Sequence, residues 1–166
     1  MKKVYRVLLF DDRPQVRIYL REKLEAMNME VFTSKSVYEA TDIWESEKDN
    51  LDAIVFDVMM PSSGLSDELR KQAQGGLLTG WIWLWQQHNP DSETYTPIGD
   101  KCVVIYSAYL DDFKKYLESE SPGAAERAFA GRLLQVYKGD LDSENKVVSY
   151  LVKDRETRDP DKVGRI

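Results

Sequence analysis

The sequence predicts an α/β fold in which helices cover both faces of a five-stranded parallel sheet. Apolar runs rich in β-branched residues alternate with segments whose apolar residues recur at helical spacing, which is typical of strands joined by helical crossovers. A charged or hydroxyl residue closes or directly follows most of these runs. The 166 residues are enough to bury one hydrophobic core. We therefore predict a single doubly wound domain over residues 1–166, with strand order 2-1-3-4-5.

The first half of the chain contains the clearest patterns. Short apolar runs bounded by charge indicate buried strands, and apolar residues at helical spacing indicate the helices between them. Pro14 suits the first turn of a helix, and Ser36 can cap the next helix. The predicted elements are strand 4–10, helix 14–27, strand 29–33, helix 36–48 and strand 53–57.

The second half departs from this regular spacing. Asp57 and Ser107 are 50 positions apart, and Ser107 and Lys153 are 46 apart. Because one βαβ unit needs only about 30 residues, we expect helical insertions before the fourth and the fifth strand, at about 62–75 and 120–140. The predicted elements are helix 77–88, strand 102–107, helix 111–119, helix 122–138, strand 147–152 and a charged tail at 154–166.

The predicted helix 77–88 carries three tryptophans. Helical spacing places Trp81 and Trp85 on one face, where we expect them in the core. Trp83 points elsewhere, so we expect it to be partly exposed.

The charged tail leaves one face of the predicted sheet uncovered. Segment 154–166 lacks an apolar stripe, although both faces of a parallel sheet must be buried. One alternative is that the helix at 122–138 folds back onto this face through Ala125, Phe129 and Leu133. The other is that a second copy of the chain covers it, which would give a homodimer. We favour the inserted helix.

Composition restricts the classes of partner. The net charge of −6 and the absence of a basic stripe disfavour direct binding to nucleic acid or to an anionic membrane. No apolar run is long enough for a signal peptide or a membrane span. Cys102 is the only cysteine, which excludes an internal disulfide and a cysteine metal cluster. We expect a soluble protein in the cytoplasm.

Charged and hydroxyl residues mark the ends of four predicted strands. Asp11 and Asp12 follow the first strand, and Asp57 ends the third. Ser107 ends the fourth strand, and Lys153 follows the fifth. In this strand order the winding reverses between strands 1 and 3, and ligands bind outside the carboxyl ends of the strands at that point.

This arrangement predicts a site for Mg²⁺ and a phosphoryl group. Neighbouring strands lie about 4.8 Å apart, so three carboxylates should crowd together and repel each other. A magnesium ion would relieve the repulsion. The hydroxyl of Ser107 and the ammonium of Lys153 could hold phosphoryl oxygens, while Asp57 acts as the nucleophile and forms an acyl phosphate.

The chain resembles the receiver domains of two-component response regulators, which have a flavodoxin-like fold. The stretches FDD, DVMMP, YSA and YLVK carry the resemblance, in this order. The resemblance implies that Mg²⁺ binds to Asp11, Asp12, Asp57 and the backbone carbonyl of Met59.

The resemblance also implies the roles of a phosphoacceptor and a switch. Asp57 matches the aspartate that accepts the phosphoryl group, and Ser107 matches the switch hydroxyl. Lys153 matches the lysine of the family, and Tyr150, three positions earlier, matches the aromatic residue whose rotamer reports phosphorylation. The family lysine is followed by proline, whereas Asp154 follows here.

Three functions are compatible with these residues. The leading hypothesis is a receiver that takes a phosphoryl group from a histidine kinase or a phosphotransfer protein, and that catalyses only its own phosphoryl transfer and dephosphorylation. The alternative is a pseudo-receiver, an interaction module without phosphoryl turnover. The third is a small phosphatase that uses the aspartate after the first strand as its nucleophile. Such an enzyme would need a second acid two positions later, and the Arg13 that stands there counts against this function.

Overall fold

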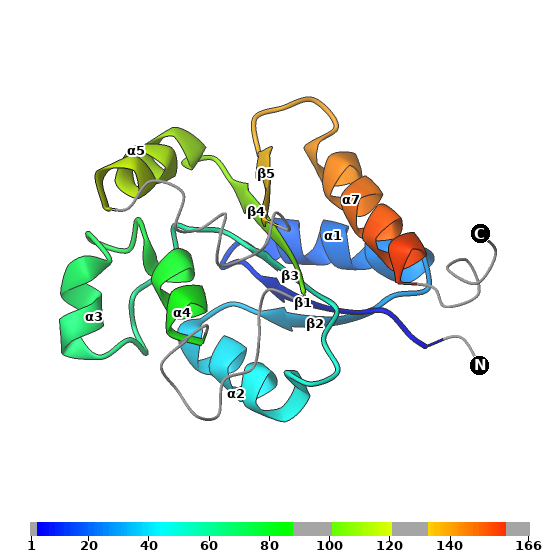
Figure 1. Cartoon of the computed structure of the whole chain (residues 1–166), viewed down its shortest axis with the longest axis horizontal. Coiled ribbons are helices and arrows are strands. Elements are labelled where there is room, and N and C mark those ends of the chain that lie inside the picture. Colours follow the sequence, from blue (N-terminus) through cyan, green and yellow to red (C-terminus); the bar gives the residue numbers. More distant parts are fainter. Residues whose placement is uncertain (1–2, 88–100, 121–132, 159–166) are drawn as a thin grey trace.

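The computed structural model describes residues 3–87, 101–120 and 133–158. These residues contain a parallel five-stranded sheet in the order β2-β1-β3-β4-β5, which confirms the predicted order. Figure 1 shows helices on both faces of the sheet. The strands are β1 (Arg6–Phe10), β2 (Glu30–Ser34), β3 (Ala53–Phe56), β4 (Cys102–Ser107) and β5 (Leu133–Tyr137).

The helices of the first half begin where the sequence signals predict. Pro14 occupies the first turn of α1, and the hydroxyl of Ser36 accepts a hydrogen bond from the backbone N–H of Glu39 at the start of α2. The short helix α3 lies within the first predicted insertion and is capped by Ser66 in the same way. The helices are α1 (Pro14–Ala26), α2 (Val37–Glu47), α3 (Asp67–Gln72), α4 (Thr79–Gln87), α5 (Leu110–Glu120) and α7 (Ser143–Thr157).

Two apolar clusters bury the two faces of the sheet. On one face, side chains of α2, α4 and α5 pack against alternate residues of the central strands. On the other face, Leu20 and Leu24 of α1 and Val147 and Leu151 of α7 pack against the intervening residues. Figure 1 shows α1 and α7 side by side over this second face. Both faces of the parallel sheet are therefore covered, as its apolar strands require.

The fifth strand lies earlier in the chain than predicted. Residues 133–137 form β5, and residues 147–152, predicted as a strand, belong to α7. The buried positions of α7 are Ser143, Val147 and Leu151, which recur every four residues, whereas Ser149 and Tyr150 are exposed. This one-sided burial is helical, and packing against the sheet outweighs the strand propensity of the β-branched residues.

This difference removes the problem of the uncovered face. The helix predicted at 122–138 is wrong over residues 133–137, which form β5, while residues 121–132, with Ala125 and Phe129, lie outside the described residues. The tail predicted at 154–166 is wrong in its first part, because α7 extends to Thr157. Since α7 covers the face, the coverage argument for a homodimer no longer holds.

Helix α4 packs tightly beneath the loop that follows β3. A Cβ atom at Gly80 would lie 2.0 Å from the backbone carbonyl oxygen of Asp57, so only glycine permits this approach. Trp83 is fully buried and makes edge contacts with Phe10 and Trp44, and the expectation that it is partly exposed was wrong. Trp85, at 39% exposure, is instead the most exposed tryptophan of this helix.

Within the described residues, hydropathy gives no sign of a transmembrane helix. None of the helices within the described ranges is both long enough and apolar enough to cross a bilayer.

Candidate functional site

The strand register brings the predicted acidic and hydroxyl residues to one edge of the sheet. Phe10 of β1 pairs with Phe56 of β3, and the N–H of Asp57 then donates to the carbonyl oxygen of Phe10 at 3.1 Å. On the other side of β4, the N–H of Lys138 donates to the carbonyl oxygen of Ser107, also at 3.1 Å. The sheet pairing thus continues one residue beyond the strands and aligns their carboxyl ends.

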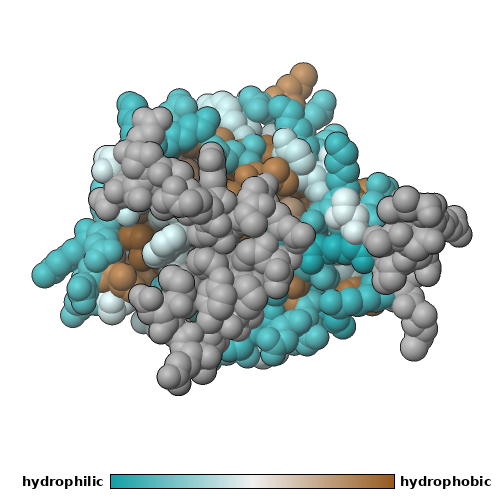
Figure 2. Space-filling model, viewed as in Figure 1, coloured by the Kyte–Doolittle hydropathy of each residue, from teal (hydrophilic) through white to brown (hydrophobic). Residues whose placement is uncertain are grey.

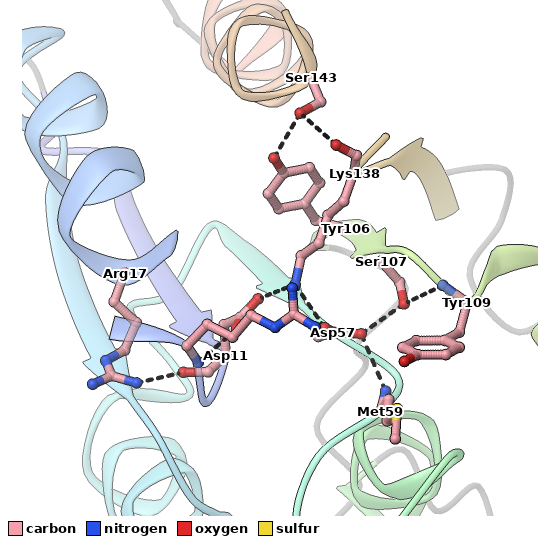
Figure 3. Close-up of polar contacts among 10 residues, drawn as sticks. Asp11, Arg17, Asp57, Met59, Tyr106, Ser107, Tyr109, Lys138 and Ser143 are labelled. Carbon is pink, nitrogen blue, oxygen red and sulfur yellow. Dashed lines mark hydrogen bonds and ion pairs between the residues drawn. The ribbon is translucent and has the colours of Figure 1, made fainter. Parts of the chain in front are cut away.

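Four side chains converge at this edge (Figure 3). The ammonium of Lys138 lies 2.7 Å from Oδ2 of Asp11 and 2.6 Å from Oδ2 of Asp57. Ser107 Oγ donates to Oδ1 of Asp57 at 2.6 Å, and the N–H of Met59 donates to the same oxygen at 3.1 Å. The carboxylate of Asp57 is therefore oriented by three donors from three different segments.

A second set of hydrogen bonds holds Asp11. Its Oδ1 accepts from the backbone N–H of Arg13 at 2.9 Å, in the turn that leads into α1. The guanidinium of Arg17 donates to the backbone carbonyl oxygen of Asp11 at 2.9 Å. Asp11 is 1% exposed, so its orientation is set by these contacts and by Lys138 rather than by solvent.

Burial and charge act in opposite directions on the ionisable groups. Burial lowers the pKa of Lys138, but the carboxylates of Asp11 and Asp57 outweigh burial and raise that pKa above its ordinary value. Burial raises the pKa of Asp11, and the charge of Lys138 only partly offsets it. With both carboxylates ionised, one ammonium serves two buried negative charges, so the cluster favours an additional cation.

Lys153 and Tyr150 lie away from this edge, and both assignments are wrong. Both residues are exposed on α7, and Lys138 supplies the ammonium instead. The segment LLQVYK, at 133–138, held the correct signal, because it places a lysine after an apolar run about one βαβ unit beyond Ser107. The more strongly β-branched run before Lys153 obscured this signal.

With Lys138 as the lysine of the site, two neighbouring positions differ from what the resemblance implies. Three positions before Lys138 stands Gln135, which is exposed, where the resemblance implies an aromatic residue. Gly139 follows Lys138 where the resemblance implies proline. Gln135 lies in β5 and Gly139 follows that strand, so both departures from the resemblance are at this end of the sheet.

The expected crowding of three carboxylates is not found. Asp12 is exposed, and the described part of the chain contains no group of three or more His, Cys, Asp or Glu side chains able to hold a metal together. The two buried carboxylates, Asp11 and Asp57, nevertheless border one point and supply hard oxygen ligands. Because Mg²⁺ commonly takes one or two carboxylates and keeps several waters, these donors fit a magnesium ion.

In fold, the chain is similar to solved structures of response-regulator receiver domains. A receiver-domain protein from Clostridium thermocellum has a TM-score of 0.54 at 16% identity, with coverage of 93% of this chain and 97% of that chain. The receiver domain of Francisella response regulator 1452 has a TM-score of 0.55 at 17% identity, with coverage of 93% and 98%. These identities show a shared fold.

A third similar structure is the signal receiver domain of an HD domain-containing protein from Pseudomonas fluorescens Pf-5. It has a TM-score of 0.56 at 11% identity and covers 93% of this chain and 97% of its own. No family model matches the chain, and no curated protein sequence matches it.

Proposed function

We propose that this chain is a phosphorylatable receiver switch of two-component signal transduction. Asp57 accepts a phosphoryl group from a phosphohistidine of a histidine kinase or a phosphotransfer protein. One observation carries the proposal: the buried carboxylate of Asp57 is held by the ammonium of Lys138, which it shares with Asp11, and by the hydroxyl of Ser107. Phosphoryl transfer asks a protein chiefly for positioning and for stabilisation of charge, and these groups provide both.

The transfer forms one bond and breaks one. A carboxylate oxygen of Asp57 attacks phosphorus, so that a P–O bond forms while the P–N bond to the donor histidine breaks. The electron pair of the broken bond stays on the histidine, which takes up a proton from solvent. Hydrolysis later returns the carboxylate and releases inorganic phosphate. The protein is thus a signalling switch that promotes only its own phosphorylation and dephosphorylation.

Two groups beside Asp57 can donate hydrogen bonds to the oxygens of a phosphoryl group on that residue. Lys138 and Ser107 already contact the two oxygens of the acceptor carboxylate, so a short movement lets each donate to the phosphoryl group. Asp11, Asp57 and the carbonyl of Met59 would hold Mg²⁺, with Asp12 nearby. The ion would offset the negative charge of the phosphoryl oxygens.

The proposal is tested with acetyl phosphate and Mg²⁺, followed by intact mass measurement of the full chain. We expect one labile phosphoryl adduct on the wild type and none on Asp57→Asn. Asp49→Asn is the matched control, because Asp49 is an exposed aspartate that precedes β3, whereas Asp57 follows that strand at its other end. Labelling of Asp57→Asn would contradict the assignment. A wild type that is never labelled would favour the pseudo-receiver.

A further inference from the structure

Tyr106 and Ser143 connect Lys138 to the first turn of α7. We infer that these two residues are positioning residues for Lys138. The ring of Tyr106 contacts the ammonium, and the hydroxyl of Ser143, at the start of α7, binds the phenol of Tyr106 and the backbone carbonyl of Lys138. This inference rests on the proposed function, because it assigns residues that orient the lysine of the phosphoryl site.

The first part of the connection is the side-chain alternation along β4. Successive residues of a strand point to opposite faces, so Ser107 faces Asp57 while Tyr106 lies in the cluster covered by α1 and α7. Tyr106 is 4% exposed. The ammonium of Lys138 lies 5.4 Å from the centroid of its ring, within the range of a cation–π contact.

The second part is a pair of hydroxyl groups behind the ring. The phenol oxygen of Tyr106 lies 2.7 Å from Oγ of Ser143, and both side chains are buried. Ser143 Oγ also donates to the backbone carbonyl oxygen of Lys138 at 3.4 Å. Figure 3 shows Ser143 between the phenol of Tyr106 and the backbone of Lys138. Both ends of Lys138, its carbonyl and its ammonium, are thus in contact with this pair.

This connection matters because a lysine side chain is long and flexible. Its orientation costs rotamer entropy unless neighbouring groups restrict it. The aromatic residue implied three positions before the lysine is absent, since Gln135 stands there and is exposed. Among the aromatic side chains within the described residues, Tyr106 makes a cation–π contact with the Lys138 ammonium. We conclude that β4, not β5, supplies the aromatic neighbour of the lysine in this protein.

The first test is a double-mutant cycle on the labelling of Asp57 by acetyl phosphate. We expect Tyr106→Phe, which keeps the ring and removes the hydroxyl, to slow labelling about fivefold, and Ser143→Ala to act similarly. In a Lys138→Met background the same two changes should have no further effect. An undiminished rate in both single variants, or an equal loss in the Lys138→Met background, would overturn the inference.

The second test measures, by NMR, how fast the ammonium protons of Lys138 exchange with solvent in the unphosphorylated full chain. The ¹⁵Nζ signal of Lys138 is identified by its loss in Lys138→Met, and its ammonium protons should exchange about fivefold faster in Tyr106→Phe and Ser143→Ala. Ser149→Ala and Tyr150→Phe change exposed residues of α7 and should leave the exchange unaltered. Exchange that is unaltered in all four variants would refute the inference even if Asp57 is labelled.

The two tests separate the inference from the proposed function. Faster exchange in a chain that acetyl phosphate never labels would support the positioning of Lys138 and refute the phosphoryl switch. Should Tyr106→Phe fail to fold, Ser143→Ala decides, because it removes one oxygen at the first turn of a helix and leaves the core ring in place.

Discussion

Lys138 and Lys153 both follow apolar runs, but only Lys138 reaches the carboxylates. We expect Lys138→Met to slow labelling of Asp57 on the order of a hundredfold, because it removes a donor aimed at developing negative charge. Lys153→Met is the matched control and should be labelled at the wild-type rate, because Lys153 is exposed on α7. The measurement is the rate of adduct formation by intact mass. Equal rates for the two variants would show that Lys138 has no part in the transfer.

Asp11 gives the site a pH-dependent stability. Burial raises its folded-state pKa above the ordinary value of an aspartate, so the folded state binds the proton more tightly than the unfolded chain does. Its stabilising contribution is therefore fully present below pH about 4 and is lost as the pH rises through the raised pKa. We expect the stability of Asp11→Asn relative to wild type to increase over this window.

Urea unfolding at several pH values measures this difference. Asp12→Asn controls for the loss of one negative charge at the same edge, because Asp12 is exposed. If the stability of Asp11→Asn relative to wild type instead falls as the pH rises, the pKa of Asp11 is not raised in the folded state.

Helix α7 is the element that the sequence pattern misassigned, and single substitutions distinguish helix from strand. Leu151 is fully buried against the sheet, whereas Tyr150 is 37% exposed. We expect Leu151→Ala to lower the free energy of unfolding by about 2–5 kcal/mol, and Tyr150→Ala to lower it by less than about 1 kcal/mol. In a buried strand both side chains would be enclosed. Comparable losses in chemical unfolding of the two variants would therefore favour the strand.

At the scale of the whole molecule, the described residues form a five-stranded sheet with helices of the same chain on both faces. Figure 2 shows that hydrophilic side chains make up most of the coloured surface in that view, with apolar side chains in small separate groups. We expect light scattering to give the mass of one chain, 19.2 kDa, for the unphosphorylated protein. A stable dimer in dilute solution would mean that a surface other than the covered sheet face joins two copies.

The sequence alone determined the first three strands, β4, the helices between them and three of the four central site residues. Each predicted boundary of α1 and α2 falls within a residue or two of the observed one. The reason is local: alternating apolar runs and caps such as Ser36 report secondary structure directly, and parallel strands end at a common edge. The sequence therefore places Asp11, Asp57 and Ser107 together, as the structure does.

Only the tertiary structure decided which apolar run becomes β5. Segments 133–137 and 147–152 both have the composition of a strand, and local propensity prefers the second. Segment 133–137 pairs with β4 as the fifth strand, while Val147 and Leu151 of α7 cover the sheet face beside α1. The choice depends on the burial of a whole face, a property of contacts distant in sequence. Because of this packing, Lys138 rather than Lys153 is the lysine of the site, and the ring of Tyr106 lies beside the ammonium of Lys138.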